Sequence, residues 1–397
     1  MRILHISSLY YPDQVGGAEV MAEVLAENQA AYGHAVAVAC ASRKEEAPAE
    51  RNGVTVYRTG HGTPYFILDQ DRRSRIERAH YRLKTKTNAY AVQKFSDVIR
   101  DFRPDVVNTH SLSELPPQIW SMVKRHQTRL VHTLHDYKSI CSKGSMFVDG
   151  HACNAQHFRC KLLTYPHQCN QSAVDAVTGV GSEILQRHLD ANLFQHVPQS
   201  LRRVIWNPVD APNHQRTRAY EPGRDIVFGF LGRIEPSKGI DVLLDACRML
   251  PRSGWQLLVT GRPSDESVPY ETRAHGLPVT FTGFMERDAF FDGIDCLIVP
   301  SVWPEAFGRT VAEAYIRGVP VIGSATAGIA EQIGPLQPDW LFPPGDAAIL
   351  AQRMLSVLEN PERLLRKPPV TDLVAERVAP AKVTEAYLDL YKAVLNS

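Results

Sequence analysis

Short hydrophobic runs rich in β-branched residues alternate along the chain with stretches in which apolar residues recur at helical spacing. In the first half this pattern predicts helices at residues 18–32 and 83–102 and strands at residues 2–8, 36–42, 54–58, 105–110, 130–135 and 174–179. In the second half it predicts helices at residues 240–250, 307–317 and 347–358 and strands at residues 225–231, 256–260, 279–282, 296–300 and 320–323. Such alternation is typical of an α/β fold with parallel sheets covered by helices.

Both halves open with a strand, a glycine-bearing turn and a helix, which predicts two doubly wound domains. The length of 397 residues suits two domains. We place the N-terminal domain at residues 1–207 and the C-terminal domain at residues 208–374, because a polar, proline-containing stretch follows Asn207-Pro208-Val209-Asp210. Residues 375–397 form a third segment, in which a separate helix is expected at residues 375–395.

The charge balance excludes recruitment of nucleic acid or membrane by a strong global field. The chain has 44 Lys and Arg against 43 Asp and Glu, which leaves a formal charge of +1. No apolar run approaches the roughly 18 residues that a bilayer span needs, and the chain turns polar too early for a signal peptide. Seven cysteines, an odd number, suit a reducing compartment, so we expect a cytoplasmic protein.

A glycine pair, Gly16-Gly17, follows the first strand and precedes a helix. The unpaired amides of a helix N-terminus can bind a phosphate, and glycines let it approach the backbone. The pair is equally compatible with a simple tight turn. The full G-x-G-x-x-G fingerprint is missing, which argues against an NAD enzyme.

The corresponding turn of the second half carries two cations. Arg233 comes directly after a strand and Lys238 lies five residues further on, at the start of the next helix. A guanidinium and an ammonium group at this place suit a diphosphate. The alternative is a solvated basic turn.

Two carboxylates flank the helix expected at residues 307–317. A helix that begins at Glu305 would put Glu305 and Glu313 on one face, whereas a helix that begins near Phe307 would leave Glu305 in the preceding loop. Carboxylates in such a crevice can hold sugar and ribose hydroxyls. Surface glutamates on an ordinary helix are the alternative.

These features resemble glycosyltransferase family 4, the retaining nucleotide-sugar transferases with the GT-B fold of two Rossmann-like domains. The resemblance covers nearly the whole chain and rests on the two glycine turns, the two glutamates, and the segments Asn207-Pro208-Val209-Asp210, Phe307-Gly308-Arg309-Thr310 and Pro320-Val321-Ile322-Gly323. The final helix resembles the family helix that crosses back to the N-terminal domain. Arg309 departs from the family pattern, since many members carry an aliphatic residue there.

The resemblance implies a role for each candidate residue. Arg233 and Lys238 would bind the diphosphate, Glu305 the donor sugar and Glu313 the ribose. Gly16, Gly17, Phe307, Gly308 and Thr310 would complete the nucleotide-sugar site, and His110 would lie close to the transferring sugar. His135 and Asp136, at the end of the next strand, would face the acceptor. For each of these two histidines taken alone, the alternative to a role in the site is a structural one, in which its side chain bonds the backbone at the end of a strand.

The activity implied is transfer of a hexose from a UDP- or GDP-sugar to a glycan or a lipid-linked acceptor, with no cofactor beyond the donor. A catalytically silent sugar-nucleotide-binding module and a GT-B epimerase are the alternatives. No residue is a clear nucleophile, so a front-face mechanism is expected, in which the departing phosphate takes the acceptor proton.

Metal ligands are considered at two places. Asp69-Gln70-Asp71 has the Asp-x-Asp form of a divalent-ion site, but Arg72, Arg73 and Arg75 can neutralise it, and we interpret it as a structural loop. Four cysteines with gaps of 11, 6 and 8 residues lack typical zinc spacing, although zinc or a labile disulfide stays open; they are Cys141, Cys153, Cys160 and Cys169.

Residues 72–103 hold ten Lys and Arg against three Asp and Glu, with interleaved apolar side chains. A basic amphipathic helix of this kind can lie on anionic lipid headgroups. A solvated helix packed on the N-terminal domain is the alternative. The predicted partners are therefore a nucleotide sugar, an acceptor and a peripheral membrane surface, without nucleic acid.

Overall fold

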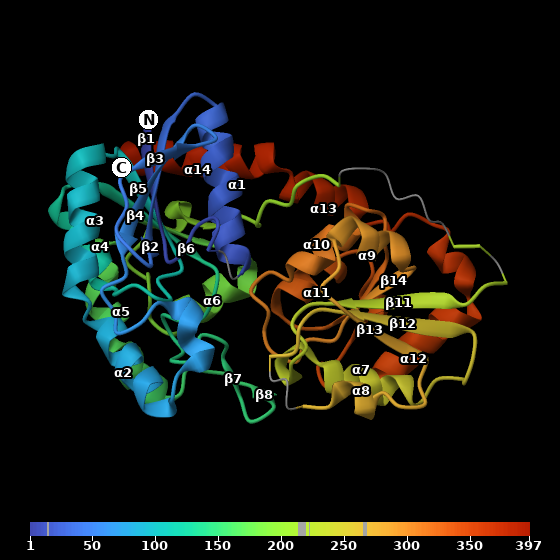
Figure 1. Cartoon of the computed structure of the whole chain (residues 1–397). Coiled ribbons are helices and arrows are strands. Elements are labelled where there is room, and N and C mark those ends of the chain that lie inside the picture. The colour runs from blue at the N-terminus through green and yellow to red at the C-terminus, as the bar shows by residue number, and fades with distance from the viewer. Residues whose placement is uncertain (14–15, 213–219, 222, 265–267) are drawn as a thin grey trace. The chain divides into compact units, whose positions relative to one another are not determined.

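The computed structural model describes residues 1–13, 16–212, 220–221, 223–264 and 268–397. The chain divides into two compact units (Figure 1). Unit 1 contains Met1–Ser145, Asn154–Pro208 and Pro380–Ser397, and unit 2 contains Met146–Cys153 and Val209–Ala379. None of the helices in the described residues is long and apolar enough to cross a membrane.

Unit 1 is built on an eight-stranded sheet in the order β10-β9-β6-β5-β1-β2-β4-β3. Only β3 runs antiparallel to its neighbour. The strands are β1 (Arg2–Ser7), β2 (Ala35–Ser42), β3 (Ala49–Arg51), β4 (Val54–Gly60), β5 (Val106–His110), β6 (Arg129–Leu134), β9 (Ala176–Gly179) and β10 (Arg202–Val204). The central strands β5 and β6 are buried along nearly their whole length, as in parallel sheets covered on both faces, although they include the polar residues Asn108, Thr109, His110, His132 and Thr133.

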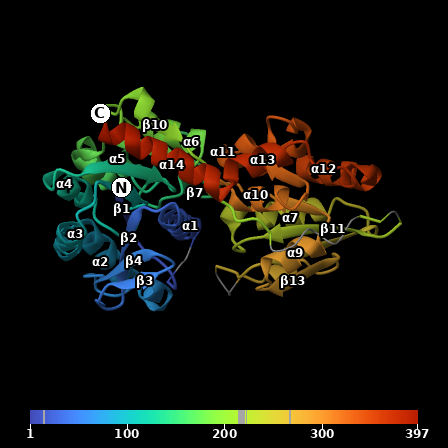
Figure 2. The ribbon, with the colours of Figure 1, turned by 90° about the horizontal axis from the view of Figure 1, so that it is seen from above.

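The helices of unit 1 cover this sheet (Figures 1 and 2). They are α1 (Gly17–Ala31), η1 (Ile67–Arg72), α2 (Arg75–Lys86), α3 (Ala89–Phe102), α4 (Gln118–Arg125), α5 (Phe158–Asn170), η2 (Gln171–Ala173), α6 (Ser182–Asp190), η3 (Gln199–Leu201) and α14 (Pro380–Leu395). α14, the last helix, packs against α1 in both views. The Tyr391 hydroxyl on α14 accepts a hydrogen bond from Asn108 Nδ2 of β5 at 2.8 Å.

The single helix predicted at residues 83–102 is wrong, because the structure has two helices there. α2 ends at Lys86, and the side chain of Asn88 caps α3 by accepting a hydrogen bond from the Ala91 amide at 3.1 Å. Asparagine is among the strongest N-cap residues, since its side chain satisfies an amide that has no partner within the helix. The break therefore has a local cause in the sequence.

Unit 2 has a six-stranded sheet in the order β13-β12-β11-β14-β15-β16, and every strand pair in it is parallel. The strands are β11 (Ile226–Leu231), β12 (Trp255–Thr260), β13 (Val279–Gly283), β14 (Cys296–Val299), β15 (Val321–Ser324) and β16 (Leu341–Phe342). The hairpin β7 (Phe147–Val148) and β8 (His151–Ala152) groups with this unit.

The helices of unit 2 alternate with its strands, as a doubly wound fold requires. They are η4 (Pro236–Lys238), α7 (Ile240–Cys247), α8 (Tyr270–Arg273), α9 (Arg287–Gly293), α10 (Arg309–Tyr315), α11 (Ala327–Ile333), η5 (Pro338–Trp340), α12 (Ala347–Glu359), η6 (Pro361–Leu364) and α13 (Thr371–Val378).

The helix predicted at residues 375–395 is also two helices. α13 ends at Val378, and α14 begins at Pro380. Proline lacks an amide hydrogen and disfavours helical backbone in the residue before it, and Ala379 accordingly has φ −56° and ψ 125°. The chain passes from unit 2 to unit 1 at this break.

Candidate functional site

Each sheet has one place where the strand order reverses. In unit 2 the order runs outward from β11 through β12 to β13 on one side and from β14 to β16 on the other. In unit 1 the corresponding neighbours are β1 and β5. Ligands of open α/β sheets bind at the carboxyl ends of the strands at such a reversal, because the loops diverge there.

The turn after β11 positions Lys238 next to the loop that follows β14. η4 ends at Lys238 and is followed by the cap residue Gly239, whose backbone is left-handed with φ 75°. A Cβ atom at Gly239 would lie 1.9 Å from the carbonyl oxygen of Pro300, so no other residue fits without displacing the backbone. Glycine thus permits the close contact that brings Lys238 to its partner.

Lys238 and Glu305 form a close ion pair at this reversal. Lys238 Nζ donates to Glu305 Oε1 at 2.6 Å, and the hydroxyl of Ser301 donates to the same oxygen at 2.7 Å. The ammonium group also lies 5.1 Å from the centre of the Trp303 ring. Only 20% of the Lys238 side chain and 13% of the Glu305 side chain are exposed, so the pair is partly shielded from water.

The charge of Glu305 is stabilised despite this shielding. Burial raises the cost of ionising the carboxyl group, but Lys238 and the hydrogen bonds outweigh it and hold the pKa of Glu305 below its ordinary value. Glu305 is therefore an anion at neutral pH and remains an acceptor for hydroxyl groups.

Arg233 extends from the same turn into solvent. Its side chain is 70% exposed, and among the described residues it pairs with the carboxylate of Glu235, at 3.5 Å. Glu235 is already held by the hydroxyls of Ser237 and Ser264, at 2.6 and 2.7 Å. Within the part of the chain that the structure describes, Arg233 thus has a long contact with a carboxylate that is bound more closely by two hydroxyl groups.

α10 begins at Arg309, so the structure places Glu305 in the preceding loop and excludes a helix that starts at Glu305. Gly308 is the N-cap in left-handed backbone, with φ 77°. Phe307 is buried, and its carbonyl accepts a hydrogen bond from Gln332. Thr310 lies half-buried in the first turn of α10.

Glu313 differs from Glu305 in its partners and in its burial. Its side chain is 3% exposed, and its Oε1 atom accepts a hydrogen bond from Arg309 Nε at 2.8 Å and lies 3.1 Å from Arg287. Arg309, which departs from the family pattern, therefore binds the glutamate that the resemblance assigns to the ribose.

At the reversal of unit 1, Gly16 is the N-cap of α1 and its amide donates to Glu19 Oε2 at 2.9 Å. The carboxylate of Glu19 thus already accepts a hydrogen bond from the Gly16 amide, which is one of the groups that the resemblance assigns to the donor site. A Cβ atom at Gly17 would meet nothing within 4 Å, so the backbone beside it is open.

His110 ends β5 and lies at the centre of a row of imidazoles. Its Nε2 is 2.8 Å from His5 Nδ1, and its Nδ1 is 3.2 Å from His135 Nε2. His5 Nε2 in turn lies 2.8 Å from Gln29 Oε1. His110 has no exposed surface, so a ligand meets this row at the His135 end.

Burial determines the charge of these histidines. It lowers the pKa of both His5 and His135 to about 4, and it lowers the pKa of His110 well below its usual range. All three imidazoles are neutral at pH 7. Beside them, Asp136 accepts hydrogen bonds from the Ser113 hydroxyl and the Lys138 amide, both at 2.7 Å.

The metal-ligand candidates have other surroundings. Asp69 of η1 accepts two hydrogen bonds from Arg43, at 2.7 and 3.0 Å. Cys141 is buried and Cys169 exposed, while Cys160 Sγ lies 3.8 Å from the Ser142 hydroxyl. Within the described ranges, no three His, Cys, Asp or Glu side chains are placed to hold a metal ion.

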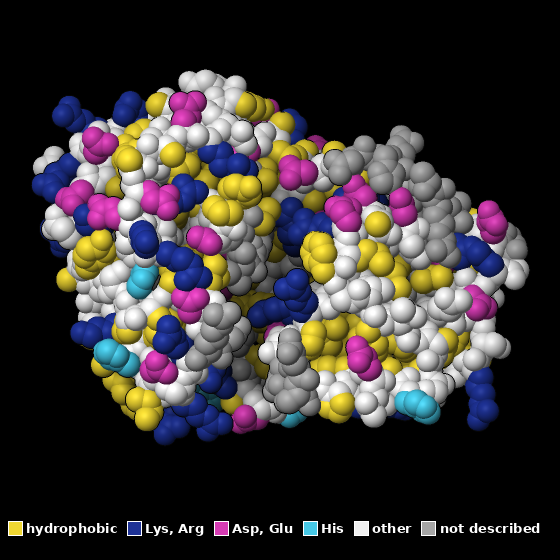
Figure 3. Space-filling model, in the orientation of Figure 1, with side chains coloured by type: hydrophobic (Ala, Val, Ile, Leu, Met, Phe, Trp, Pro, Cys, Tyr) yellow, Lys and Arg dark blue, Asp and Glu magenta, His cyan; other side chains and the backbone are white. Residues whose placement is uncertain are grey.

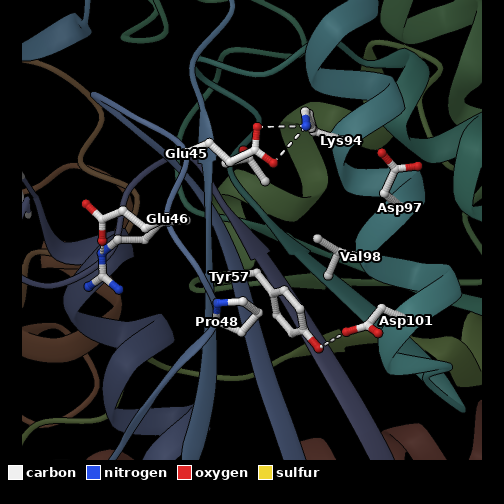
Figure 4. A pocket seen from close by; sticks show the side chains of 10 residues that line it. Glu45, Glu46, Pro48, Tyr57, Lys94, Asp97, Val98 and Asp101 are labelled. Atoms are coloured by element: carbon white, nitrogen blue, oxygen red, sulfur yellow. Dashed lines mark hydrogen bonds and ion pairs between the residues drawn. The ribbon is translucent and has the colours of Figure 1, made fainter.

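Unit 1 also has a hollow of about 190 Å³ between β4 and α3 (Figure 4). Its polar groups bind one another, since Lys94 pairs with Glu45 at 2.7 Å and the Tyr57 hydroxyl donates to Asp101 at 2.6 Å. We assign no ligand to this hollow.

Sequence reasoning missed several residues that complete the two sites. Ser301 and Arg287 bind the two glutamates, and Gln29 and His5 extend the histidine row. His5 had a visible signal, because it is a polar residue inside the apolar run Ile3-Leu4-His5-Ile6. Gln29 had none, because its contact with His5 depends on how α1 packs on the sheet.

Comparisons with known proteins agree with this architecture. The family model "Glycosyltransferase Family 4" matches residues 15–211, and "Glycosyl transferases group 1" matches residues 213–367. A solved structure of Anabaena HepE in complex with UDP superposes with a TM-score of 0.70 at 16% identity, covering 99% of this chain and 100% of that one. The two units thus form a GT-B fold.

Two relatives extend the match along the chain. An O-antigen chain mannosyltransferase C from Escherichia coli is 24% identical and is covered, like this chain, over 100% of its length. An uncharacterised 42.6 kDa protein from the cps region of Klebsiella pneumoniae is 26% identical, over 83% of this chain and 87% of that protein. The chain belongs to glycosyltransferase family 4, and its activity is glycosyl transfer.

Proposed function

We propose that the chain is a retaining, metal-independent glycosyltransferase that moves a hexose from a UDP- or GDP-sugar to a glycan or lipid-linked acceptor. The proposed pathways are polysaccharide, lipopolysaccharide or glycolipid biosynthesis. The name of the Escherichia coli relative supports a hexose and a surface polysaccharide, and the UDP in the Anabaena structure supports a nucleoside diphosphate.

The observation that carries the proposal is the Lys238–Glu305 pair at the strand reversal of unit 2, next to the exposed Arg233. Arg233 and Lys238 bind the diphosphate as a fork and a point charge and stabilise the negative charge of the leaving group. Glu305 remains ionised and accepts hydrogen bonds from sugar hydroxyls. Glu313, with Thr310 and the backbone at Phe307 and Gly308, holds the nucleoside.

The roles in unit 1 follow from the state of its histidines. Both ring nitrogens of His110 are engaged, so its proposed effect on the transferring sugar is exerted through His135. His135 and Asp136 bind the acceptor, and Gly16-Gly17 contributes open backbone near the donor. A neutral histidine provides hydrogen bonds to hydroxyl groups without attracting the diphosphate to this unit.

Retention without a nucleophile is proposed as a front-face reaction. The glycosidic bond to the phosphate breaks, the phosphate oxygen takes the proton of the acceptor hydroxyl, and the acceptor oxygen bonds the anomeric carbon on the same face. Arg233 and Lys238 supply the positive charge that a divalent ion supplies in other transferases.

The decisive experiment is a thermal-shift screen with UDP-, GDP- and ADP-sugars, followed by a transfer assay in the presence of EDTA. A ligand that binds the folded state raises its apparent stability. A sugar nucleotide that stabilises the protein but is neither hydrolysed nor transferred would indicate a silent binding module. Conversion of the donor sugar without an acceptor would indicate an epimerase.

We further propose that unit 1 contacts anionic lipid through α2 and α5, here called the α2–α5 surface. Ile76 and Leu83 of α2 are 83% and 64% exposed, and Phe158 and Leu162 of α5 are 80% and 69% exposed. Lys86 of α2 donates to the Leu163 carbonyl of α5 at 2.7 Å, which joins the two helices.

The positive charge of the α2–α5 surface favours an anionic partner. α2 contains five Lys and Arg and one Glu, and α5 contains one Arg and one Lys and no acidic residue. Basic and hydrophobic side chains lie next to each other over α2 in Figure 3. Apolar side chains among cations suit an anionic bilayer surface, and the cations of α3 do not contribute, because Lys94 and Arg100 pair with acidic neighbours.

A further inference from the structure

The histidine row of unit 1 is a chain of hydrogen bonds with a defined direction. Gln29 Oε1, at its inner end, is a carbonyl oxygen and can only accept, so His5 Nε2 carries a hydrogen. A neutral imidazole has one N–H group, and His5 Nδ1 is therefore a lone pair that accepts from His110 Nε2.

The same rule continues to the outer end. His110 Nδ1 is a lone pair and accepts from His135 Nε2, which leaves His135 Nδ1 without a hydrogen. The amide of Gln29 thus fixes the tautomer of a residue three hydrogen bonds away. Both Gln29 and His5 are fully buried, so no solvent competes for these contacts.

The outer nitrogen, His135 Nδ1, is buried and has no hydrogen-bond partner among the described residues. A buried acceptor without a partner is costly, and this one follows β6, the strand next to β5, so a hydroxyl group of a ligand is the partner that it lacks. Because Nδ1 has almost no exposed area, a ligand reaches it only after the side chains above it move.

We propose that His135 Nδ1 accepts a hydrogen bond from a hydroxyl group of the sugar substrate, and that Gln29 and His5 are positioning residues that keep it an acceptor through His110. The identity of the ligand rests on the proposed glycosyl transfer, whereas the expected tautomer of His135 does not depend on it. A substrate hydroxyl meets a lone pair in this arrangement and would meet an N–H donor if the chain ran in the opposite direction.

The proposal is tested by NMR on the full-length protein with isotope-labelled histidine, whose ring signals distinguish the two neutral tautomers. We expect His135 with hydrogen on Nε2 in the wild type. In Gln29→Met no carbonyl oxygen sets the direction of the hydrogen bonds along the histidine row. A measurable fraction of His135 should then carry hydrogen on Nδ1. His188, whose Nδ1 donates to the Ile184 carbonyl at 2.7 Å, is an internal reference that should not change.

The matched control is Gln93→Met, the same change at an exposed position of α3. In transfer assays Gln29→Met should lower kcat/KM about tenfold, while its affinity for UDP alone, bound by unit 2, should match that of the control. A wild-type His135 with hydrogen on Nδ1, or identical tautomers in wild type and Gln29→Met, would overturn the proposal. The wild-type spectrum decides even if the variant does not fold, and it decides without turnover.

Discussion

The two units share the order of their central strands and differ in the chemistry at the reversal. Unit 2 places an ion pair there, Lys238 with Glu305, next to an exposed arginine. Unit 1 places neutral imidazoles at the corresponding strands, His5 on β1 and His110 on β5, and a third, His135, after the neighbouring strand β6. The sheet topology thus determines where a ligand can bind in each unit. The side chains near the carboxyl ends of the strands determine whether that place suits phosphate or hydroxyl groups.

The largest expected effect comes from a backbone change next to the Lys238–Glu305 ion pair of unit 2. Gly239→Ala brings a Cβ atom to within 1.9 Å of the Pro300 carbonyl oxygen and should destabilise unit 2 by about 3 kcal/mol or more. Gly345→Ala is the matched control, because Gly345 has a similar φ of 84° and nothing within 4 Å. It should cost about 1 kcal/mol in urea unfolding. Equal losses for both variants would refute the role of the contact.

The second effect removes the cation and retains the fold. Lys238→Ala should weaken UDP binding by about 1.5–3 kcal/mol and uridine binding much less, because only the diphosphate loses a charge-assisted contact. Isothermal titration calorimetry measures both. Lys392→Ala, an exposed position on α14, is the control. Unchanged UDP affinity in Lys238→Ala would remove Lys238 from the donor site.

A third test separates the units by pH. Burial lowers the pKa of His5, His135, His167 and His188 to about 4, against 6.5 in the unfolded chain, so the unfolded state binds more protons between these values. Unit 1 should therefore lose stability as pH falls from 6.5 toward 4. Glu305, with its lowered pKa, contributes stability that is lost only below about pH 4.5. Hydrogen exchange at pH 7 and pH 5 should show increased opening in unit 1 peptides first.

The last test concerns the α2–α5 surface. Vesicles with anionic lipid should bind the protein and release it as salt rises, since each cation near such a surface contributes about 1 kcal/mol. Reversing Arg75, Arg78 and Arg82 to Glu should abolish binding without altering donor hydrolysis. Arg100→Glu, on α3, is the control. Equal binding to neutral vesicles would contradict the electrostatic part of the proposal.

The sequence was sufficient for the fold because most strands contain buried β-branched or other apolar residues and alternate with helical patterns. It failed where a local signal competes with periodicity, at Asn88 and at Pro380, which divide the two longest predicted helices. The donor candidates Lys238 and Glu305 were predictable, because a strand end locates them. Their contact was not, since it depends on how closely Gly239 approaches Pro300.

The C-terminal helix gives unit 1 a particular order of assembly during synthesis. α14 places the Tyr391 hydroxyl against Asn108 and the Tyr387 hydroxyl 3.4 Å from Thr133, both buried in the unit 1 sheet. These residues of β5 and β6 leave the ribosome long before α14 does. Unit 2 can therefore complete its core first. Until α14 has been synthesised, the site on the unit 1 sheet that α14 covers remains uncovered. A chaperone that shields this site would act on the N-terminal half even after unit 2 has folded.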